Sequence, residues 1–127
     1  MKPELVPPQI TRAAMIEEYD VMMARIGPLL KNVTPPFGAA IVEIDPGRAI
    51  RLHAHTEHEF YFVFSGTGSM VVGEAEYAVT PGSLVYIPPQ SEHSLRATTE
   101  AVRMCAVWWE PSPEGTAQGS FNRQGEP

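Results

Sequence analysis

The sequence has one cysteine, few basic residues and no long hydrophobic run. Cys105 alone allows no internal disulfide and excludes a structural zinc site built from cysteines, so any metal chemistry must use His and carboxylate. Nine Lys and Arg against fifteen Asp and Glu give a net charge of −6, and no basic run favours nucleic acid as a partner. The start MKPELVPPQ lacks a signal peptide's apolar run, and a membrane span would need about 18 successive apolar residues. We therefore predict a cytoplasmic protein without a membrane partner.

The length and composition of the chain predict one folded domain. The chain has 127 residues, of which 43% are hydrophobic, an ordinary level for a globular protein with one core. The sequence pattern changes after residue 36 and again after residue 110. We expect an N-terminal arm and helix packed on the barrel over 1–36, a β-barrel over 37–110, and a Gly- and Pro-rich tail over 111–127.

A helix is predicted over residues 11–26. Thr11 is a suitable N-cap, and Gly27-Pro28 ends the segment. Apolar side chains recur inside it at spacings of four, three and four, as on one face of a helix: Met15, Tyr19, Met22 and Ile26. We expect this face to pack on the barrel or on a second subunit.

Short runs rich in Val, Ile, Tyr and Phe begin at Phe37 and are separated by turn residues. Eight strands are predicted, over residues 37–44, 49–55, 59–64, 68–72, 75–79, 83–87, 92–97 and 101–109. No pattern of helical length lies between them. The expected fold is therefore all-β, a closed antiparallel sheet or a jelly roll.

The segment LHAHTEHEF holds three of the four histidines. Residues two apart in a strand share a face, so His53 and His55 point to one side, and Glu59 can return to that side on the next strand. His93, near the start of a later strand, supplies a fourth group. Three neutral imidazoles and one carboxylate suit a divalent transition metal and leave positions open for water or substrate.

The spacing of these residues resembles the two motifs of the cupin superfamily. The first motif is matched by Gly47, five residues, His53-Ala54-His55, three residues, Glu59, six residues and Gly66. The second is matched by Gly82, five residues, Pro88 and then His93. The likeness covers roughly residues 38–110 and departs from the family at two positions that are not metal ligands there, Gln90 and Ala97.

The resemblance implies a small monocupin, a double-stranded β-helix or jelly-roll barrel, here with one N-terminal α-helix. It also implies one divalent metal at the four residues described above, with Fe(II) favoured and Mn, Ni, Co or Zn also suitable. Glu57 has the same parity as Glu59 and competes with it for the metal, although its position breaks the family spacing. His58 has the opposite parity, so we expect it in solvent or behind the ligands.

Parity from Glu59 directs Tyr61 into the cavity, where a phenol can donate a hydrogen bond or, with a lowered pKa, act as a base. A core tyrosine with a satisfied hydroxyl is the alternative. Arg51 shares the parity of His53, so its guanidinium can either clamp a substrate carboxylate or reach solvent. Three further residues are candidates for the substrate pocket, with structural roles as the alternative: Tyr86, Met104 and Trp108.

Three classes of function remain open. The favoured one is an Fe(II) dioxygenase acting on a small organic substrate. The second is a non-redox, metal-dependent lyase, isomerase or decarboxylase that uses Tyr61 as base; small cupins that cleave dimethylsulfoniopropionate look similar, including a Tyr two residues after the metal Glu. The third is a cupin that binds or senses a small molecule.

A homodimer is also expected. Three alternate side chains of one predicted strand form an aromatic ridge that points away from the cavity: Phe60, Phe62 and Phe64. A barrel of this size has a limited core, so an exposed apolar surface needs a cover, and a twofold partner is the simplest one. We expect the N-terminal segment or the tail, with Phe121 as its anchor, to cross the interface.

Overall fold

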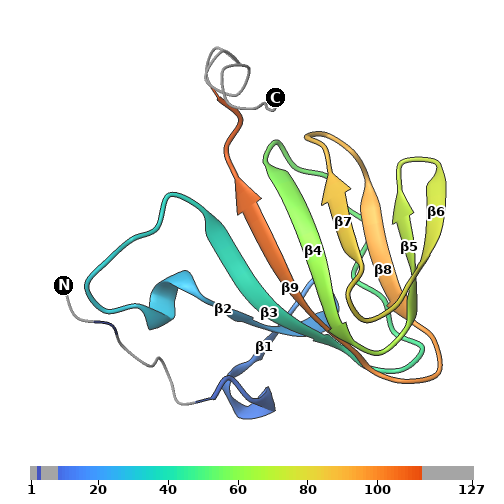
Figure 1. Ribbon diagram of the computed structural model, residues 1–127, viewed down its shortest axis with the longest axis horizontal. Helices are drawn as coiled ribbons and strands as arrows, with labels where there is room; N and C mark the ends of the chain where they lie inside the picture. The colour runs from blue at the N-terminus through green and yellow to red at the C-terminus, as the bar shows by residue number, and fades with distance from the viewer. Residues whose placement is uncertain (1–2, 4–8, 113–127) are drawn as a thin grey trace.

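The computed structural model describes residue 3 and residues 9–112. Nine strands and two 3-10 turns form this part of the chain (Figure 1). In chain order they are η1 (Arg12–Ala14), β1 (Ile16–Glu18), β2 (Val21–Arg25), η2 (Gly27–Leu29), β3 (Gly38–Ile44), β4 (His58–Ser65), β5 (Gly68–Val72), β6 (Ala75–Val79), β7 (Leu84–Ile87), β8 (His93–Ala97) and β9 (Val102–Trp109).

The strands form two antiparallel sheets. The larger sheet has the order β1-β2-β3-β9-β4-β7, and the smaller one has the order β6-β5-β8 (Figure 1). Buried side chains of both sheets belong to one hydrophobic cluster, with Val42, Val63 and Met104 from the larger sheet and Met70 and Leu95 from the smaller. The all-β prediction is confirmed.

Alternation along β4 separates a buried face from an exposed one. Tyr61 and Val63 are 3% and 0% exposed, whereas Phe62 and Phe64 are 37% and 46% exposed. Successive strand residues point to opposite faces, and the core takes one of them. This is the parity predicted from the sequence, and it directs Glu59 and Tyr61 to the same side as the core.

The predicted helix over 11–26 is wrong. No α-helix occurs in residues 9–112, and the segment instead forms a 3-10 turn followed by the β1–β2 hairpin. The backbone of β2 pairs with β3 in a register that joins Met22 to Glu43 and Arg25 to Ala40. Ladder hydrogen bonds to an existing sheet outweigh the weak local preference for helix, so β1 and β2 extend the larger sheet.

The predicted strand over 49–55 is also absent. Only two isolated bridges form there, Ala49 with Arg96 and His53 with His93. The segment runs beside β8 of the smaller sheet, where the N–H groups of Gly47 and Ile50 also donate to the carbonyls of Ala97 and Leu95, but these bonds are too irregular to form a strand. Phe121 and almost all of the tail lie outside the described residues. Among the residues that are described, no helix is long and apolar enough to cross a bilayer.

Candidate metal centre

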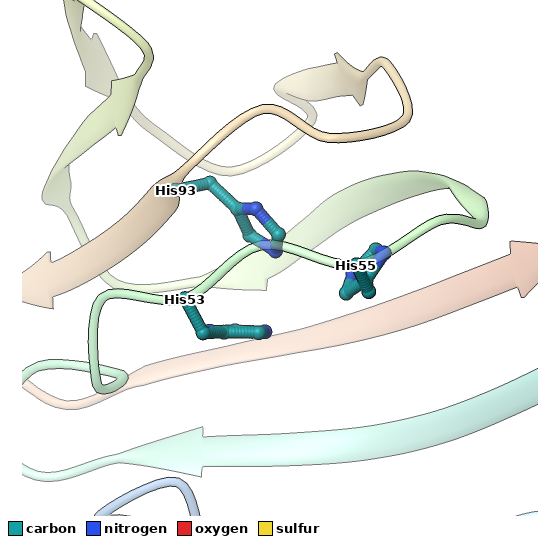
Figure 2. Close-up of side chains that lie close together, drawn as sticks. All are labelled: His53, His55 and His93. Carbon is teal, nitrogen blue, oxygen red and sulfur yellow. The ribbon is translucent and has the colours of Figure 1, made fainter.

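Three histidines from two separate segments converge at one point. His53 and His55 lie in the irregular segment before β4, and His93 is the first residue of β8. Their candidate ligand atoms all lie within 4.8 Å of one another (Figure 2). The bridge between His53 and His93 joins the two segments directly, because each backbone N–H donates to the other residue's carbonyl, at 3.3 and 2.9 Å.

The backbone fixes the tautomer of each imidazole. Nδ1 of His53 lies 2.7 Å from the Arg51 carbonyl, and Nδ1 of His93 lies 2.9 Å from the Ser91 carbonyl. His55 repeats the arrangement with the Glu57 carbonyl at 3.2 Å. A carbonyl oxygen only accepts, so Nδ1 of His53 and of His93 carries the proton and each of these neutral rings keeps its lone pair on Nε2. His55 would have the same form with a metal at its Nε2, which otherwise can donate to the Glu59 carboxylate at 2.9 Å.

The carboxylate of Glu59 lies against two of these lone pairs. Its Oε1 is 2.9 Å from Nε2 of His55 and 3.1 Å from Nε2 of His93. Glu59 is only 6% exposed, and the buried His93 Nε2 has no hydrogen-bond partner among the described residues. Acceptors this close repel unless a cation lies between them, and two ligands at right angles on bonds of about 2.1 Å would be about 3.0 Å apart. These residues therefore fit a divalent metal.

Electrostatics keep His53 neutral. Burial lowers its pKa below the ordinary 6.5, because the charged imidazolium is poorly solvated there. The hydrogen bond to the Arg51 carbonyl opposes this shift, and the neighbouring rings of His93 and His55 add to it. A neutral imidazole is the form that binds a metal.

Two of the three histidines, His53 and His55, line a cavity of about 180 Å³, and the buried His93 lies behind them. Besides His53, His55 and Glu59, its lining consists of Tyr19, Met23, Arg25, Ala40, Val42, Ile50, Glu57, Tyr61, Met104, Ala106 and Trp108. Three of the predicted pocket residues, Tyr61, Met104 and Trp108, are in this lining. The aliphatic side chains cover one part of the wall, and the polar groups gather at the histidines.

Arg51 and Tyr86 were also predicted in the pocket, and the structure places both outside its lining. The Arg51 side chain is 63% exposed and pairs with Asp20 at 3.1 Å. Because no strand forms over 49–55, parity with His53 does not direct the Arg51 side chain. Tyr86 pairs with Phe60 in the β4–β7 register, so it shares the outward face.

Two acidic groups of the predicted site occupy different positions in the cavity. The ring of Tyr61 packs edge-on against His93, with centroids 5.9 Å apart. Burial, and secondarily the Glu59 carboxylate, raise the pKa of Tyr61 well above 10, so without a metal its phenol is protonated at neutral pH. Glu57 lies 3.5 Å from Nδ1 of His55, behind the ring and not at its metal-facing nitrogen.

His58 lies on the outer face, as its parity predicted. Its Nδ1 and the Tyr86 hydroxyl share a hydrogen bond of 2.6 Å. Its ring stacks on Trp109 at 5.4 Å with an interplanar angle of 11°. It is thus absent from the cluster of metal-facing nitrogens.

The sequence interpretation missed the wall that the β1–β2 hairpin provides. Tyr19, Met23 and Arg25 all line the cavity. The Arg25 guanidinium lies 5.5 Å from the Trp108 ring centroid, and its Nε and Nη2 donate to the Glu18 carboxylate at 3.0 and 2.7 Å. The turn sequence Tyr-Asp is not one of the usual Asn-Gly or Asp-Gly hairpin pairs, so no local signal marked it.

Comparison with known proteins identifies the family. Residues 40–110 match the Cupin domain family, and the chain belongs to that family. A Cupin 2 conserved barrel domain protein from Salinispora arenicola CNS-205 has the same fold, with a TM-score of 0.76 and 25% identity. That alignment covers 96% of this chain and 98% of the other.

Several curated relatives are enzymes, among them the following three. The dimethylsulfoniopropionate lyase DddW of Ruegeria pomeroyi is 35% identical over 50% of this chain and 41% of its own length. A 5-nitrosalicylic acid 1,2-dioxygenase of a Bradyrhizobium species is 32% identical over 53% of this chain and 32% of its own length. The L-ectoine synthase of Vibrio campbellii is 32% identical over 68% of this chain and 69% of its own length. The chain thus spans less than half of the first two relatives.

The geometry predicts that removal of one inward histidine abolishes metal binding. His55→Ala deletes an Nε2 that faces the cluster, so about one equivalent of metal bound by the native chain should be lost in elemental analysis. His58→Ala is the matched control, because it deletes a neighbouring imidazole on the outer face, and it should keep the metal. Equal metal content in the two variants would contradict the assignment.

Metal affinity should also depend on pH. Protons compete with the metal for all three Nε2 atoms, so the dissociation constant for Co(II) should rise about tenfold or more per unit as the pH falls below about 6. The lowered pKa of His53 keeps that ring neutral, and so able to bind the metal, further into the acid range. Titrations at pH 7.5, 6 and 5 measure this, and a constant affinity would count against histidine ligands.

Proposed function

We propose that this protein is a metal-dependent enzyme that carries out a non-redox reaction, of the lyase or isomerase type, on a small carboxylic acid. The observation that carries the proposal is the position of Tyr61. It places a buried acid–base group in the cavity beside His93, within the lining shared with the other inward histidines. Proton transfer is the chemistry that such a group provides.

His53, His55, Glu59 and His93 would hold the metal, which when bound would supply Lewis-acid polarisation of a substrate oxygen. The chain's own residues provide the rest. The backbone carbonyls that contact the three Nδ1 atoms orient the rings so that the Nε2 atoms face the metal position. The apolar wall, which includes Val42, Ile50 and Met104, excludes water from the reacting atoms.

Tyr61 would hold or move the proton at its Oη. As a neutral phenol it donates a hydrogen bond to a substrate oxygen or a proton to a leaving group. With a divalent cation bound nearby, the pKa of the Tyr61 phenol would be lower, which is the change that a role as base requires. The same side chain therefore serves either direction of proton transfer.

Arg25 supports a carboxylate as part of the substrate. Its bonds to Glu18 use Nε and Nη2, so Nη1 can donate to a ligand in the cavity. The contact with Trp108 holds the guanidinium plane in place. Arg25 thus takes the role that the sequence suggested for Arg51. Two relatives carry such substrates in their names, dimethylsulfoniopropionate and 5-nitrosalicylic acid.

A dioxygenase with Fe(II) is the second candidate. The 5-nitrosalicylic acid 1,2-dioxygenase relative and the apolar part of the cavity wall favour it. Iron also suits a site of three imidazoles and one carboxylate. A protein that only binds or senses a small molecule would use the same site without turnover. The cytoplasmic location remains a prediction of the sequence.

The deciding experiment compares turnover with and without oxygen. The chain is loaded separately with Fe(II), Mn(II), Co(II), Ni(II) and Zn(II) and incubated with a panel of small carboxylic acids that includes dimethylsulfoniopropionate. Turnover in sealed anaerobic vessels, equal to that in air, is the result we expect. Turnover that needs oxygen and iron would replace the proposal by the dioxygenase, and binding without turnover would replace it by the sensor.

Tyr61→Phe should reduce kcat by about 10²-fold while the metal content and KM change little, because only the proton-carrying oxygen is removed. Tyr86→Phe is the control, since that hydroxyl lies on the outer face, and its kcat should equal the native value. Steady-state kinetics with the acid that turns over, together with elemental analysis, measure both. An unchanged kcat in Tyr61→Phe would make Tyr61 a core residue.

Arg25→Gln should raise KM for the carboxylate substrate by about tenfold or more, because a charge-assisted hydrogen bond is lost on binding. Arg51→Gln removes a guanidinium outside the cavity and should leave KM unchanged. The corresponding amide of the substrate should bind equally to native protein and Arg25→Gln. Equal KM values for the acid in native protein and Arg25→Gln would refute the role of Arg25.

We also propose that the chain forms a homodimer through the outer face of β4 and β7. This face exposes large apolar side chains from both strands: Phe62, Phe64, Leu84 and Tyr86. Light scattering at micromolar concentration should give twice the 14.0 kDa chain mass. Phe64→Glu should give the single-chain mass, and a native protein at 14.0 kDa would reject the dimer.

A further inference from the structure

Three non-glycine residues adopt positive φ among the described residues, and all three lie in turns that contact the histidine segment. They are Tyr19 at 53°, Asp20 at 70° and Gln90 at 68°. Such backbone angles are strained for side chains with a Cβ and persist only where the surrounding structure imposes them. Contacts made by these turns must therefore hold their backbone in the strained conformation.

The first turn joins β1 to β2 in a two-residue hairpin loop. Glu18 pairs with Val21, so Tyr19 and Asp20 are its two central residues. A loop of this length with positive φ at both positions normally contains Asn or Gly, because those residues adopt the left-handed region at least cost. A tyrosine is an unfavourable choice for the turn itself.

The ring of Tyr19 explains the choice, because it packs on a metal-facing histidine. Its centroid lies 4.4 Å from that of His53, with an interplanar angle of 31°. The turn is tied to the same segment twice more, by the Arg51 N–H, which donates to the Tyr19 carbonyl at 2.8 Å, and by the Asp20–Arg51 ion pair at 3.1 Å. Three contacts thus join the hairpin to residues 51–53.

His53 needs this support because no strand holds its backbone. It has only the isolated bridge to His93 and its own Nδ1 bond to the Arg51 carbonyl. The bond from Nδ1 fixes the tautomer of His53, but neither bond packs against the face of its ring. Tyr19 covers a face of the ring at the cavity.

We infer that Tyr19 is a positioning residue: the strained Tyr19–Asp20 turn holds the His53 ring in the orientation that aims Nε2 at His55 and His93. The inference rests on the proposed metal site. It adds that residues of the β1–β2 hairpin, outside the matched Cupin domain segment, set the geometry of that site.

The turn at Gln90 acts on the neighbouring ligand in a similar way. Its N–H donates to the His55 carbonyl at 2.7 Å. Gln90 is also one of the two positions at which the sequence departs from the cupin motifs. Both strained turns therefore hold the histidine segment, one on each ligand.

The test uses four variants of the turn and the dissociation constant for Co(II), measured by competition with a chelator. Tyr19→Ala and Tyr19→Gly both remove the ring and should weaken Co(II) binding about tenfold or more. Tyr19→Phe keeps the ring and should stay within about threefold of the native protein. Asp20→Gly keeps the ring, relieves strain in the same turn and removes only the solvent-exposed ion pair with Arg51, which contributes little, so it should also stay within about threefold of the native protein.

Thermal melting of the metal-free variants distinguishes an effect on the orientation of His53 from an effect on folding stability. Tyr19→Gly should melt at a higher temperature than Tyr19→Ala, since only glycine is unstrained at this φ, yet bind Co(II) equally weakly. A merely structural tyrosine would instead make affinity follow melting temperature. Native-like Co(II) affinity in both ring-deleted variants, or a loss in Tyr19→Phe equal to that in Tyr19→Ala, would overturn the inference.

A readout without metal keeps the inference separate from the proposed function. The rings of His53 and His93 have centroids 4.3 Å apart, so metal-free protein should show a nuclear Overhauser contact between them. The contact should persist in Tyr19→Phe and be lost in Tyr19→Ala. If native protein binds no Co(II), the metal function fails, and this contact alone decides: its persistence in Tyr19→Ala would refute the role of Tyr19.

Discussion

The structure depends on one electrostatic constraint: several hydrogen-bond acceptors face each other in a buried space. Backbone carbonyls take the proton-bearing side of all three imidazoles, so their other nitrogens have lone pairs, and Glu59 brings an oxygen to within 2.9 and 3.1 Å of two of them. A buried polar atom without a partner costs about 1–3 kcal/mol, and a buried carboxylate beside further acceptors costs more. A cation at their common centre would remove this cost, which is why these residues fit a divalent metal.

The fold brings these acceptors together by placing two ligands on regular strands and two on an irregular segment that neighbouring turns hold in place. Glu59 and His93 come from β4 and β8, where ladders fix the backbone. His53 and His55 come from a stretch with only isolated bridges, and the Tyr19 and Gln90 turns hold it from outside. The same hairpin closes the cavity with Met23 and Arg25. The β1–β2 hairpin therefore both orients a metal ligand and forms part of the wall of the cavity.

Sequence alone predicted the part of this arrangement that follows strand periodicity. Alternation along β4 placed Tyr61 inward and the phenylalanines outward. The four ligand candidates were found through the resemblance to the cupin motifs, because His53 and His55 lie outside any strand and parity does not fix their direction. Prediction from the sequence failed where tertiary pairing decides. Met15, Tyr19, Met22 and Ile26 have helical spacing, yet β3 offers the segment a free edge, which local propensity cannot reveal. For the same reason the parity of Arg51 with His53 left a carboxylate clamp and a solvent position equally open for Arg51, and the structure places its side chain in solvent while Arg25 lines the cavity.

X-ray absorption at the metal edge of protein loaded with one equivalent of Co(II) or Fe(II) tests the central claim most directly. We predict a first shell of nitrogen and oxygen at about 2.0–2.2 Å, without sulfur, and multiple scattering from three imidazoles. Glu59→Gln should keep the three imidazoles and change only the oxygen part of the shell. A shell with one imidazole or none, or one that contains the sulfur of Cys105, would contradict the account.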